Sequence, residues 1–505
     1  MLRLFVGGVL CHPGGNMCGI IGIYDPEGKA APKAALLLAK LQNRGPQGTG
    51  AVSIDEEGLL HEVRGPGLVE AVLGAPHILS SLRGSIVTGQ VRYATFGETI
   101  QPLVGYWKGR RDQPIIVAHN GEFGNAISLR REAQERWQYQ FQSTSDTEVI
   151  LPFLEYARES DFKEALLDVV RRKIRGAFSL IIFFGGKFYC IRDRHGVRPL
   201  VVGRNKEGVV AIASEDSALR VLDVEDVRYV DAAELLVVAP DGIEEEICWA
   251  ERDRKSCIFE HVYFANPDSD IEGINVSLAR DRMGAIAFEE IGWRYDMDVL
   301  IPILDSGLHP TLGLHEALLD YAVLHGEKLV PLKAGVHRSW FVGRTFQEQE
   351  QATREILQRV KSSVIAAWVR GKRVWVGDDS LVRGTVTRAI TALMRLAGAK
   401  EVHWIIFSPP TIGFCPYGVD TYQDELIAAR LKDIDAVRNF IGADSLHHLS
   451  IDGLYRAVTE AVSPYVRTKE EFCAACFTGR YPIPFEQDRT EKPRPGENLT
   501  INDSR

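Results

Sequence analysis

A cysteine that could act as a nucleophile stands near the start of the chain, in the sequence Met17-Cys18-Gly19. If Cys18 became the first residue, its thiol would lie beside a free α-amine, whose ordinary pKa is about 7.7–8.0. An amine that titrates near neutrality can serve as the base that activates the thiol. The alternative is a buried cysteine at the start of an apolar strand. The nucleophile therefore requires residues 1–17 to be a removed leader or a misassigned start.

Three further places in the first half carry groups that suit such a nucleophile, and each has a purely structural alternative. The guanidinium of Arg92 could bind a substrate carboxylate through two hydrogen bonds, or it could form a structural salt bridge within the protein. Asn120 and Gly121 could donate N–H groups to a developing oxyanion, or they could form a turn. Asp146 could bind an ammonium group or cap a helix. Together these residues predict a pocket for a substrate with a carboxylate and an ammonium group.

The second half carries two adjacent carboxylates, Asp378 and Asp379, at the tip of a predicted buried strand. A turn of small and hydroxyl-bearing residues then leads into a helix, whose N-terminal N–H groups can bind a phosphate. The carboxylates could meet ribose hydroxyls and the Mg²⁺ that accompanies a diphosphate. Acidic residues that merely solvate a strand end are the alternative. The other polar and glycine positions of this motif are Ser380, Arg383, Gly384 and Thr385.

The elements around these motifs predict an α/β protein of two domains. In the first half, strands are predicted at 85–93, 114–119, 177–184 and 187–193, and helices at 32–41, 148–157 and 162–174. In the second half, strand–helix–strand alternation predicts a parallel sheet, whose ligands bind at the carboxyl ends of its strands. Those strands are predicted at 298–304, 373–377 and 402–407. The domains are predicted at 18–250 and 251–485, with a polar tail at 486–505.

Composition and charge exclude several classes of protein. The chain has 505 residues, of which 45% are hydrophobic and 25% charged, and this is typical of a globular protein with several cores. A net charge of −9 argues against a nucleic-acid partner. No apolar run reaches the roughly 18 residues of a membrane helix. Eight cysteines are too sparse for a secreted disulfide scaffold, so we expect a cytoplasmic location.

The set of motifs in the first half resembles the glutaminase domain of N-terminal-nucleophile amidotransferases, which is an αββα sandwich. The resemblance implies that Cys18 attacks the side-chain amide of glutamine and releases ammonia. It further implies that Arg92 and Asp146 hold the α-carboxylate and α-amine, and that Asn120 and Gly121 bind the oxyanion. The motifs that carry it, besides the terminal cysteine, are Asn43-Arg44-Gly45-Pro46, Val91-Arg92-Tyr93, His119-Asn120-Gly121 and Ser145-Asp146-Thr147-Glu148.

The second half is similar to type I phosphoribosyltransferases in three loops. Residues 374–385 resemble the loop that binds phosphoribosylpyrophosphate. Residues 303–307 resemble the pyrophosphate loop, which implies roles for Ser306 and Gly307. Residues 341–346 resemble the flexible loop that closes over the diphosphate, with Arg344 stabilising the leaving group. The resemblance implies one Mg²⁺ per subunit, held by Ser306, Asp378 and Asp379.

Joined in this order, the two halves resemble the glutamine amidophosphoribosyltransferase family over residues 18–485. That family makes 5-phosphoribosylamine from phosphoribosylpyrophosphate and glutamine, which opens purine biosynthesis, and it passes ammonia between its two sites. The resemblance implies a homo-oligomer, commonly a tetramer, that purine nucleotides inhibit. Glutaminases of this type also serve other acceptors, and related folds can bind nucleotides without catalysis. A different phosphosugar acceptor and a sensor of phosphoribosylpyrophosphate are therefore the alternative hypotheses.

Four cysteines make the chain resemble the iron–sulfur branch of this family. They fall where those members hold a [4Fe–4S] cluster, one per subunit. One Cys-x-x-Cys pair with two distant cysteines suits a cuboidal cluster that joins separate segments. A structural zinc ion, which usually draws on two close pairs, and unligated thiols are the alternatives. The residues are Cys257, Cys415, Cys473 and Cys476.

Several positions depart from the family pattern around the diphosphate. Trp340 stands where the family has a basic residue, and Leu304 replaces the usual lead-in to the pyrophosphate loop. His309 and His315 enter a region usually lined by small residues. The loss of one charge-assisted hydrogen bond to the diphosphate would weaken its binding by about 1.5–3 kcal/mol. We therefore expect these changes to affect the efficiency of the transferase rather than the fold.

Overall fold

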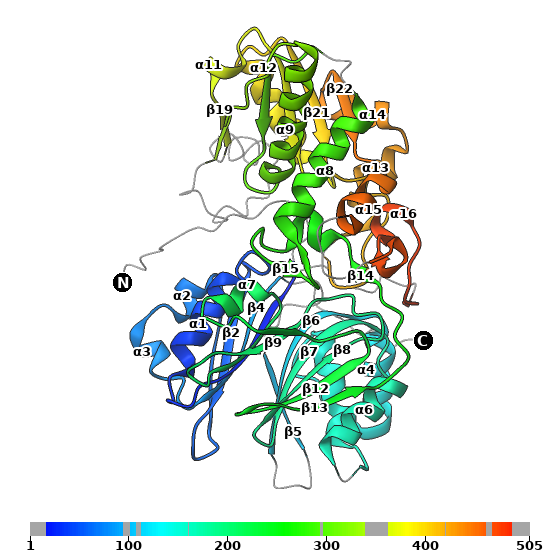
Figure 1. Cartoon of the computed structure of the whole chain (residues 1–505). Coiled ribbons are helices and arrows are strands. Elements are labelled where there is room, and N and C mark those ends of the chain that lie inside the picture. Colours follow the sequence, from blue (N-terminus) through cyan, green and yellow to red (C-terminus); the bar gives the residue numbers. More distant parts are fainter. Residues whose placement is uncertain are drawn as a thin grey trace, which may run out of the picture.

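The computed structural model describes residues 17–93, 102–107, 113–159, 161–292, 296–338, 362–419, 421–460 and 467–486. The chain forms two stacked halves, with residues up to Cys248 in one and the remainder in the other (Figure 1). The predicted leader up to residue 16, the predicted flexible-loop residue Arg344 and all but the first residue of the predicted tail lie outside the described residues. None of the helices in the described part is long and apolar enough to cross a membrane.

The first half contains two antiparallel sheets packed face to face. The strands that carry Arg92 and Asn120, β4 (Ile86–Arg92) and β6 (Gln113–Phe123), belong to different sheets. The seven-stranded sheet runs in the order β11 (Val227–Tyr229), β9 (Val201–Arg204), β10 (Val210–Ala213), β1 (Gly19–Tyr24), β4 (Ile86–Arg92), β2 (Gly48–Ile54) and β3 (Leu60–Pro66). The six-stranded sheet runs in the order β13 (Gly242–Cys248), β12 (Glu234–Ala239), β8 (Lys187–Arg192), β7 (Gly176–Phe184), β6 (Gln113–Phe123) and β5 (Leu103–Trp107).

Helices cover the outer face of each sheet. The first sheet is covered by α1 (Ala30–Lys40), α2 (Val69–Leu73), α3 (Pro76–Leu79) and α7 (Asp216–Arg220). The second is covered by α4 (Ala126–Trp137), the 3₁₀ turn η1 (Asp146–Val149), α5 (Ile150–Glu155) and α6 (Phe162–Arg172). A separate core, which includes Ile20, Ile116 and Ile181, fills the space between the sheets. These four layers confirm the predicted αββα sandwich.

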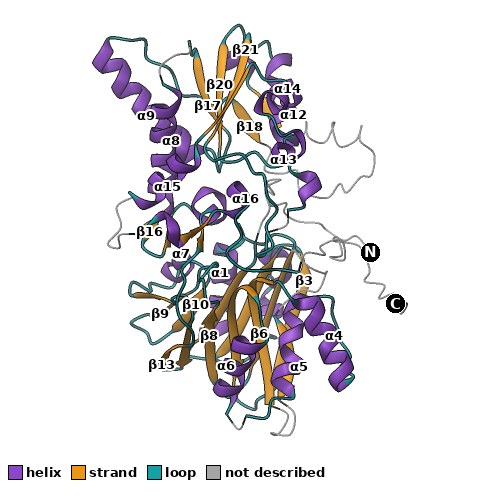
Figure 2. Cartoon of the chain, turned by 90° about the vertical axis from the view of Figure 1, so that its right-hand side faces the viewer, coloured by secondary structure: helices purple, strands orange, loops and turns teal. Residues whose placement is uncertain are grey.

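The second half is built on a parallel sheet in the order β17 (Val299–Pro302), β20 (Arg373–Asp378), β21 (Glu401–Ile406) and β22 (Ser445–His448). One face is covered by α8 (Val276–Ile291) and α9 (Leu308–His325), and the other by α12 (Thr385–Leu396) and α14 (Ile434–Ile441) (Figure 2). The parallel sheet with helices on both faces confirms the predicted transferase fold. Smaller elements are β18 (Val336–Arg338), β19 (Ser362–Val364), α11 (Ala366–Val369), η3 (Gln423–Glu425), α13 (Ile427–Leu431) and α15 (Ile451–Thr459).

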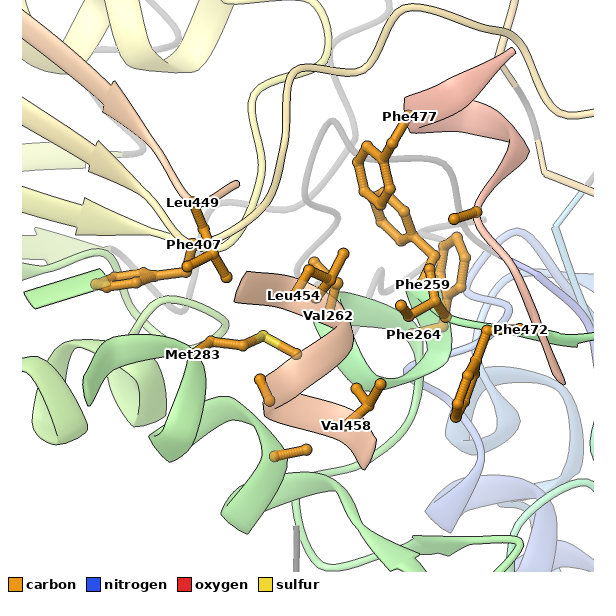
Figure 3. Close-up of a cluster of buried hydrophobic side chains, with 14 of the residues drawn as sticks. Phe259, Val262, Phe264, Met283, Phe407, Leu449, Leu454, Val458, Phe472 and Phe477 are labelled. Atoms are coloured by element: carbon orange, nitrogen blue, oxygen red, sulfur yellow. The ribbon is translucent and has the colours of Figure 1, made fainter. Parts of the chain in front are cut away.

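A shared core joins the two halves. Two short parallel strands, β14 (Ser256–Cys257) and β23 (Phe472–Cys473), pair at the junction, beside a π-helical turn, η2 (Glu260–Phe264). Phe259, Phe264 and Phe477 pack together there (Figure 3). The same cluster includes Met17, Ala177 and Val197 of the first half. The junction is completed by β15 (Asp270–Ile271), β16 (Ile274–Asn275), η4 (Lys469–Glu471) and α16 (Ala475–Thr478).

Most of the predicted elements agree with the structure to within a few residues. The predicted strand at 114–119 is longer than expected, since β6 continues through the Asn120–Gly121 pair to Phe123. The predicted helix at 148–157 begins as the 3₁₀ turn η1 and becomes α-helical only from Ile150. Gly398 has a φ of +93° just after α12, as expected of a helix-ending glycine. The domain boundaries stay a prediction.

Candidate active sites

Cys18 immediately precedes β1 and is half-buried. Its Sγ donates to the carbonyl oxygen of Tyr93 at 3.7 Å. Desolvation raises the pKa of the Cys18 thiol, and the positive charge of Arg92 partly opposes this effect. Because a thiol with a raised pKa is a weak nucleophile at neutral pH, this site can work only with a base close to the sulfur.

Asn120 and Gly121 lie next to each other in β6, where backbone and side chain are fixed by the sheet. The side chain of Asn120 is 1% exposed, and neither its amide nitrogen nor its amide oxygen has a hydrogen-bond partner among the described residues. Gly121 has a φ of +139°, and a Cβ at this position would overlap the carbonyl oxygen of Ala177. A buried donor without a partner costs about 1–3 kcal/mol, so its place is explained by a ligand that accepts from it.

Arg92 and Asp146 come from different elements, and both lie near the thiol. Arg92 is the last residue of β4, Asp146 is the first of η1, and the charges of both act on Cys18. Asp146 accepts from the backbone N–H of Phe123 at 3.0 Å. The capping alternative is wrong, because the N-cap of η1 is Ser145, whose side chain accepts from Thr147. The carboxylate of Asp146 also lies 3.7 Å from His119 Nδ1, so it is held at the site by groups other than the helical turn that it begins.

Two residues that the sequence alone did not place in the site hold its parts together. The side chain of Gln90, which is fully buried in β4, donates to the His119 carbonyl at 2.9 Å and accepts from the His119 N–H at 3.1 Å. Its amide also acts to lower the pKa of the Cys18 thiol. Gln90 thus ties one sheet to the other beside the nucleophile. The signal that could have found it is an amide side chain in the middle of an apolar strand.

The second residue is Gly418, from the other half of the chain. Its φ is +99°, and a Cβ built on it would lie 2.8 Å from the carbonyl carbon and oxygen of Gly121. The loop that carries Gly418 therefore touches the backbone of the Asn120–Gly121 pair directly. This contact can be made only without a side chain, and it supports the pair from outside the sandwich.

In the second half, the two predicted loops are in contact at the carboxyl end of the parallel sheet. A Cβ on Gly307 would lie 2.6 Å from the carbonyl oxygen of Gly377 and 2.9 Å from the Cα of Asp378. Ser306 and the acidic pair are all buried, and Ser380 Oγ donates to Asp379 at 2.5 Å. Burial and the negative charge of Asp379 raise the pKa of Asp378 well above its ordinary value. This site favours a cationic ligand, because a cation relieves the repulsion between the two carboxylates.

The turn from Ser380 to Thr385 leads into α12. Gly384, with a φ of +70°, is the N-cap and Thr385 is the first helical residue, so the first N–H groups of this twelve-residue helix face the turn. Arg383 is held by Glu425 of η3, at 2.6 Å from Nη2 to Oε2. Its guanidinium is therefore engaged in an ion pair with a neighbouring loop.

The four cysteines of the second half line a single cavity. Cys257 and Cys473 are paired in register between β14 and β23, and Cys476 lies in α16. Burial raises the pKa of the Cys257 thiol to about 11, and the positive charge of Arg198 partly opposes this effect. Arg198 Nη2 donates to Cys415 Sγ at 3.8 Å. Among the described residues, no three His, Cys, Asp or Glu side chains are arranged to hold a single metal ion.

Comparison with known proteins gives the same pairing of two activities in one chain. A glutamine amidotransferase domain matches residues 94–221. Amidophosphoribosyltransferase 2, chloroplastic, of Arabidopsis thaliana is 38% identical over 480 residues, which are 94% of this chain and 81% of that protein. Amidophosphoribosyltransferase of Bacillus subtilis is 34% identical, covering 93% and 95% of the two chains. This chain belongs to the amidophosphoribosyltransferase family.

A solved structure agrees with this membership. Glutamine phosphoribosylpyrophosphate amidotransferase from B. subtilis, complexed with ADP and GMP, superposes with a TM-score of 0.83 at 33% identity. The match covers 93% of this chain and 98% of that one. An amidophosphoribosyltransferase thus has both the sandwich and the parallel sheet, in this order.

The unusual histidines of this amidophosphoribosyltransferase have local partners. His309, near the start of α9, pairs through Nδ1 with Ser277 Oγ at 2.9 Å. His315 Nε2 lies 2.8 Å from the carbonyl oxygen of Val330. Both contacts pack α9 against neighbouring segments, so these two departures have a structural explanation.

Proposed function

We propose that this amidophosphoribosyltransferase moves the amide nitrogen of glutamine to 5-phosphoribosyl 1-pyrophosphate, with release of glutamate and pyrophosphate. This is the first committed step of purine biosynthesis. The observation that carries the proposal is the presence of two preformed sites in one chain, one suited to glutamine and one to phosphoribosylpyrophosphate. Named amidophosphoribosyltransferases match this chain over more than 90% of its length. The buried amide of Asn120 and the buried acidic pair at Asp378 mark these sites.

In the glutaminase reaction, we assign the nucleophile to Cys18 as the first residue of the mature chain. Its α-amine takes the thiol proton, and the sulfur attacks the side-chain amide carbon of glutamine. Asn120 and Gly121 donate to the resulting oxyanion. The amine then returns the proton to the leaving ammonia, and water hydrolyses the thioester. Arg92 and Asp146 would hold the α-carboxylate and α-ammonium of the substrate.

In the transfer reaction, ammonia attacks C1 of the ribose and the pyrophosphate leaves. Asp378, Asp379 and Ser306 would hold one Mg²⁺ per subunit, which neutralises charge on the diphosphate. Two carboxylates completed by substrate oxygens are the usual way in which Mg²⁺ binds such substrates. The N–H groups at Gly384 and Thr385 suit the 5-phosphate. We assign Gly307 to the diphosphate and Arg344 to the leaving group, while Arg383 would have to leave Glu425 to reach the substrate.

We propose that the cysteine cavity holds one structural [4Fe–4S] cluster per subunit. Four thiols surround a shared space. Burial raises the pKa of three of them, Cys257, Cys473 and Cys476, and a positively charged iron core is the kind of ligand that offsets the burial of thiolates. One close pair with two distant cysteines favours such a cluster over a single zinc ion. The cluster would tie β14, the Cys415 loop and α16 together, rather than take part in the chemistry.

We further propose a cytoplasmic homo-oligomer, a tetramer in the simplest case, that purine nucleotides inhibit. The nucleotide proposal is supported by the B. subtilis structure, which was obtained in complex with ADP and GMP. Several plant relatives are named as chloroplastic, so the compartment differs within the family.

The test is to purify the protein with its natural amino terminus and to measure glutamate and pyrophosphate release together. We expect pyrophosphate release to require glutamine or ammonia, and glutamate release to rise when phosphoribosylpyrophosphate is added. Intact mass should show a chain that begins at Cys18. Glutamine hydrolysis without any use of phosphoribosylpyrophosphate would favour a different acceptor, and an active chain that retains residues 1–17 would overturn the assignment of Cys18.

A further inference from the structure

Four charged side chains form a buried network at the junction of the two halves, and none of them belongs to the reactions described above. Arg44 and Glu215 come from the first half, and Glu260 comes from η2 in the second. Arg198 completes the network at 3.6 Å from Glu260. The side chains are between 0 and 1% exposed, and their formal charges cancel.

One end of this network holds the backbone of the nucleophilic residue. Arg44 Nε donates to the carbonyl oxygen of Cys18 at 3.0 Å. Arg44 Nη1 and Nη2 donate to the two carboxylate oxygens of Glu260 at 3.1 and 3.0 Å. Because the guanidinium is planar, this bidentate pair with Glu260 also fixes the direction in which Nε points.

The other side of η2 is fixed by the transferase half. Arg280, in α8, donates to the carbonyl oxygens of His261 and Ala265 at 2.8 and 2.9 Å. These two carbonyls lie in and just after the turn that carries Glu260. One of the two carboxylates that orient Arg44 is therefore placed by elements outside the glutaminase sandwich. The other, Glu215 of the first half, accepts from Arg44 Nη1 at 2.6 Å. π-Helical turns of this kind occur often at functional sites.

We propose that Glu260 is a positioning residue for the glutaminase reaction: through Arg44 it holds the Cys18 main chain at the place from which the thiol can attack. The inference rests on the proposed glutaminase function of Cys18. It makes the first half catalytically incomplete without the second, since a misplacement of about 1 Å at a reacting group can cost about 100-fold in rate. Arg44, which the sequence placed in a motif without a role, acquires one here.

The test compares Glu260→Gln with a matched control, Glu272→Gln. Glu272 also bridges two arginines across the junction, with Arg192 Nη2 at 2.6 Å and with Arg467, but these contacts do not involve Cys18. We expect E260Q to lower kcat for glutamine hydrolysis by about 10- to 100-fold, with KM for glutamine changed less than about threefold. E272Q should stay within about twofold of the wild type in both.

Two further readouts separate positioning from general damage. The rate at which 6-diazo-5-oxonorleucine alkylates Cys18, measured across pH, should fall in E260Q and not in E272Q. Ammonia-dependent transfer should stay within about twofold of the wild type in both variants, because it bypasses Cys18. If E260Q does not fold, Glu260→Asp keeps the charge but shortens the reach, and we expect the same loss of kcat.

Three results would overturn the inference. The first is an unchanged alkylation rate in the folded Glu260 variant. The second is a loss of kcat in E272Q as large as that in E260Q, and the third is a loss of ammonia-dependent transfer in E260Q that equals its loss of glutamine hydrolysis. The comparison is made only on a wild type that hydrolyses glutamine. A wild type that does not would refute the proposed function instead, so the two failures are distinguishable.

Discussion

The two candidate sites of this molecule are built in different ways. In the glutaminase half, Arg92, Asn120 and Gly121 lie within strands and are held by the sheets on both sides. In the transferase half, the acidic pair ends a strand, and the remaining groups lie on the loops that follow. Stabilising an oxyanion requires donors that are already in place, whereas a diphosphate must be admitted and then enclosed. The contrast indicates that the site that must stabilise an oxyanion is built on strands, and that the site that must admit and enclose a diphosphate is built on loops.

The largest effect should come from removing the nucleophile. Cys18→Ala is expected to lower glutamine-dependent synthesis of phosphoribosylamine by more than about 10⁴-fold, while ammonia-dependent synthesis continues. Both rates can be followed by pyrophosphate release. If the ammonia-dependent rate were lost as well, the two sites would not act separately, and the contrast between them would be wrong.

A smaller but still large loss is expected at the oxyanion position. Asn120→Ala should lower kcat for glutamine hydrolysis by about 10²–10³-fold, because one fixed donor is lost, with little change in KM. Asn125→Ala is the matched control, since Asn125 lies just beyond the same strand and its Nδ2 donates to the Lys173 carbonyl at 2.9 Å. A KM effect in place of a kcat effect would assign Asn120 to substrate binding.

Loss of a cysteine from the cavity should reduce stability rather than the rate of chemistry. Cys473→Ser is expected to lower iron and sulfide content and to lower Tm by roughly 5–10 °C, since loss of a metal group is among the changes that cost several kcal/mol. Cys190→Ala is the control, because Cys190 is a buried thiol in the core between the sheets. A variant that keeps its iron would remove Cys473 from the set of ligands.

The smallest effect on stability concerns the acidic pair and pH. Since burial and Asp379 raise the pKa of Asp378, the folded protein binds a proton that the unfolded chain has released, and stability falls as pH rises from about 4 through the raised pKa. Asp378→Asn should therefore increase Tm above that window and lose the advantage near pH 4, while transfer activity is lost. Thermal unfolding without Mg²⁺, at a series of pH values, measures this. An equal Tm difference at every pH would contradict it.

Much of this arrangement could be predicted from local sequence. Alternating and apolar runs and helical periodicity predicted most strands and helices and the parallel sheet of the second half, because each strand or helix buries a face that its own residues define. The αββα sandwich was implied by the family resemblance. The Asn120–Gly121 pair was recognised by residue type and order. At Asp146 the local sequence allowed two interpretations, because a carboxylate at the start of a helix can cap that helix or bind a ligand. The structure shows that Ser145 is the cap.

What could not be predicted depends on contacts between distant segments. The pairing of Arg44 with Glu260 joins residues 216 positions apart, and nothing in either local pattern indicates it. Gln90 bridges the two sheets through His119, and neither strand's own pattern indicates that these two residues meet. The engagement of Arg383 with Glu425 depends on where η3 lies. In each case the fold selects one partner among many residues that could make the same kind of contact.

The close approach of Gly418 to Gly121 also has a consequence for the synthesis of the polypeptide on the ribosome. The oxyanion pair leaves the ribosome long before the residue that supports it, so a nascent sandwich lacks that support until the transferase half has been made and has docked. We expect ribosome-bound or truncated amino-terminal fragments to hydrolyse glutamine poorly, which a translation-arrest assay of glutamate release can measure. Cells that make this protein would then be spared futile consumption of glutamine by unfinished chains.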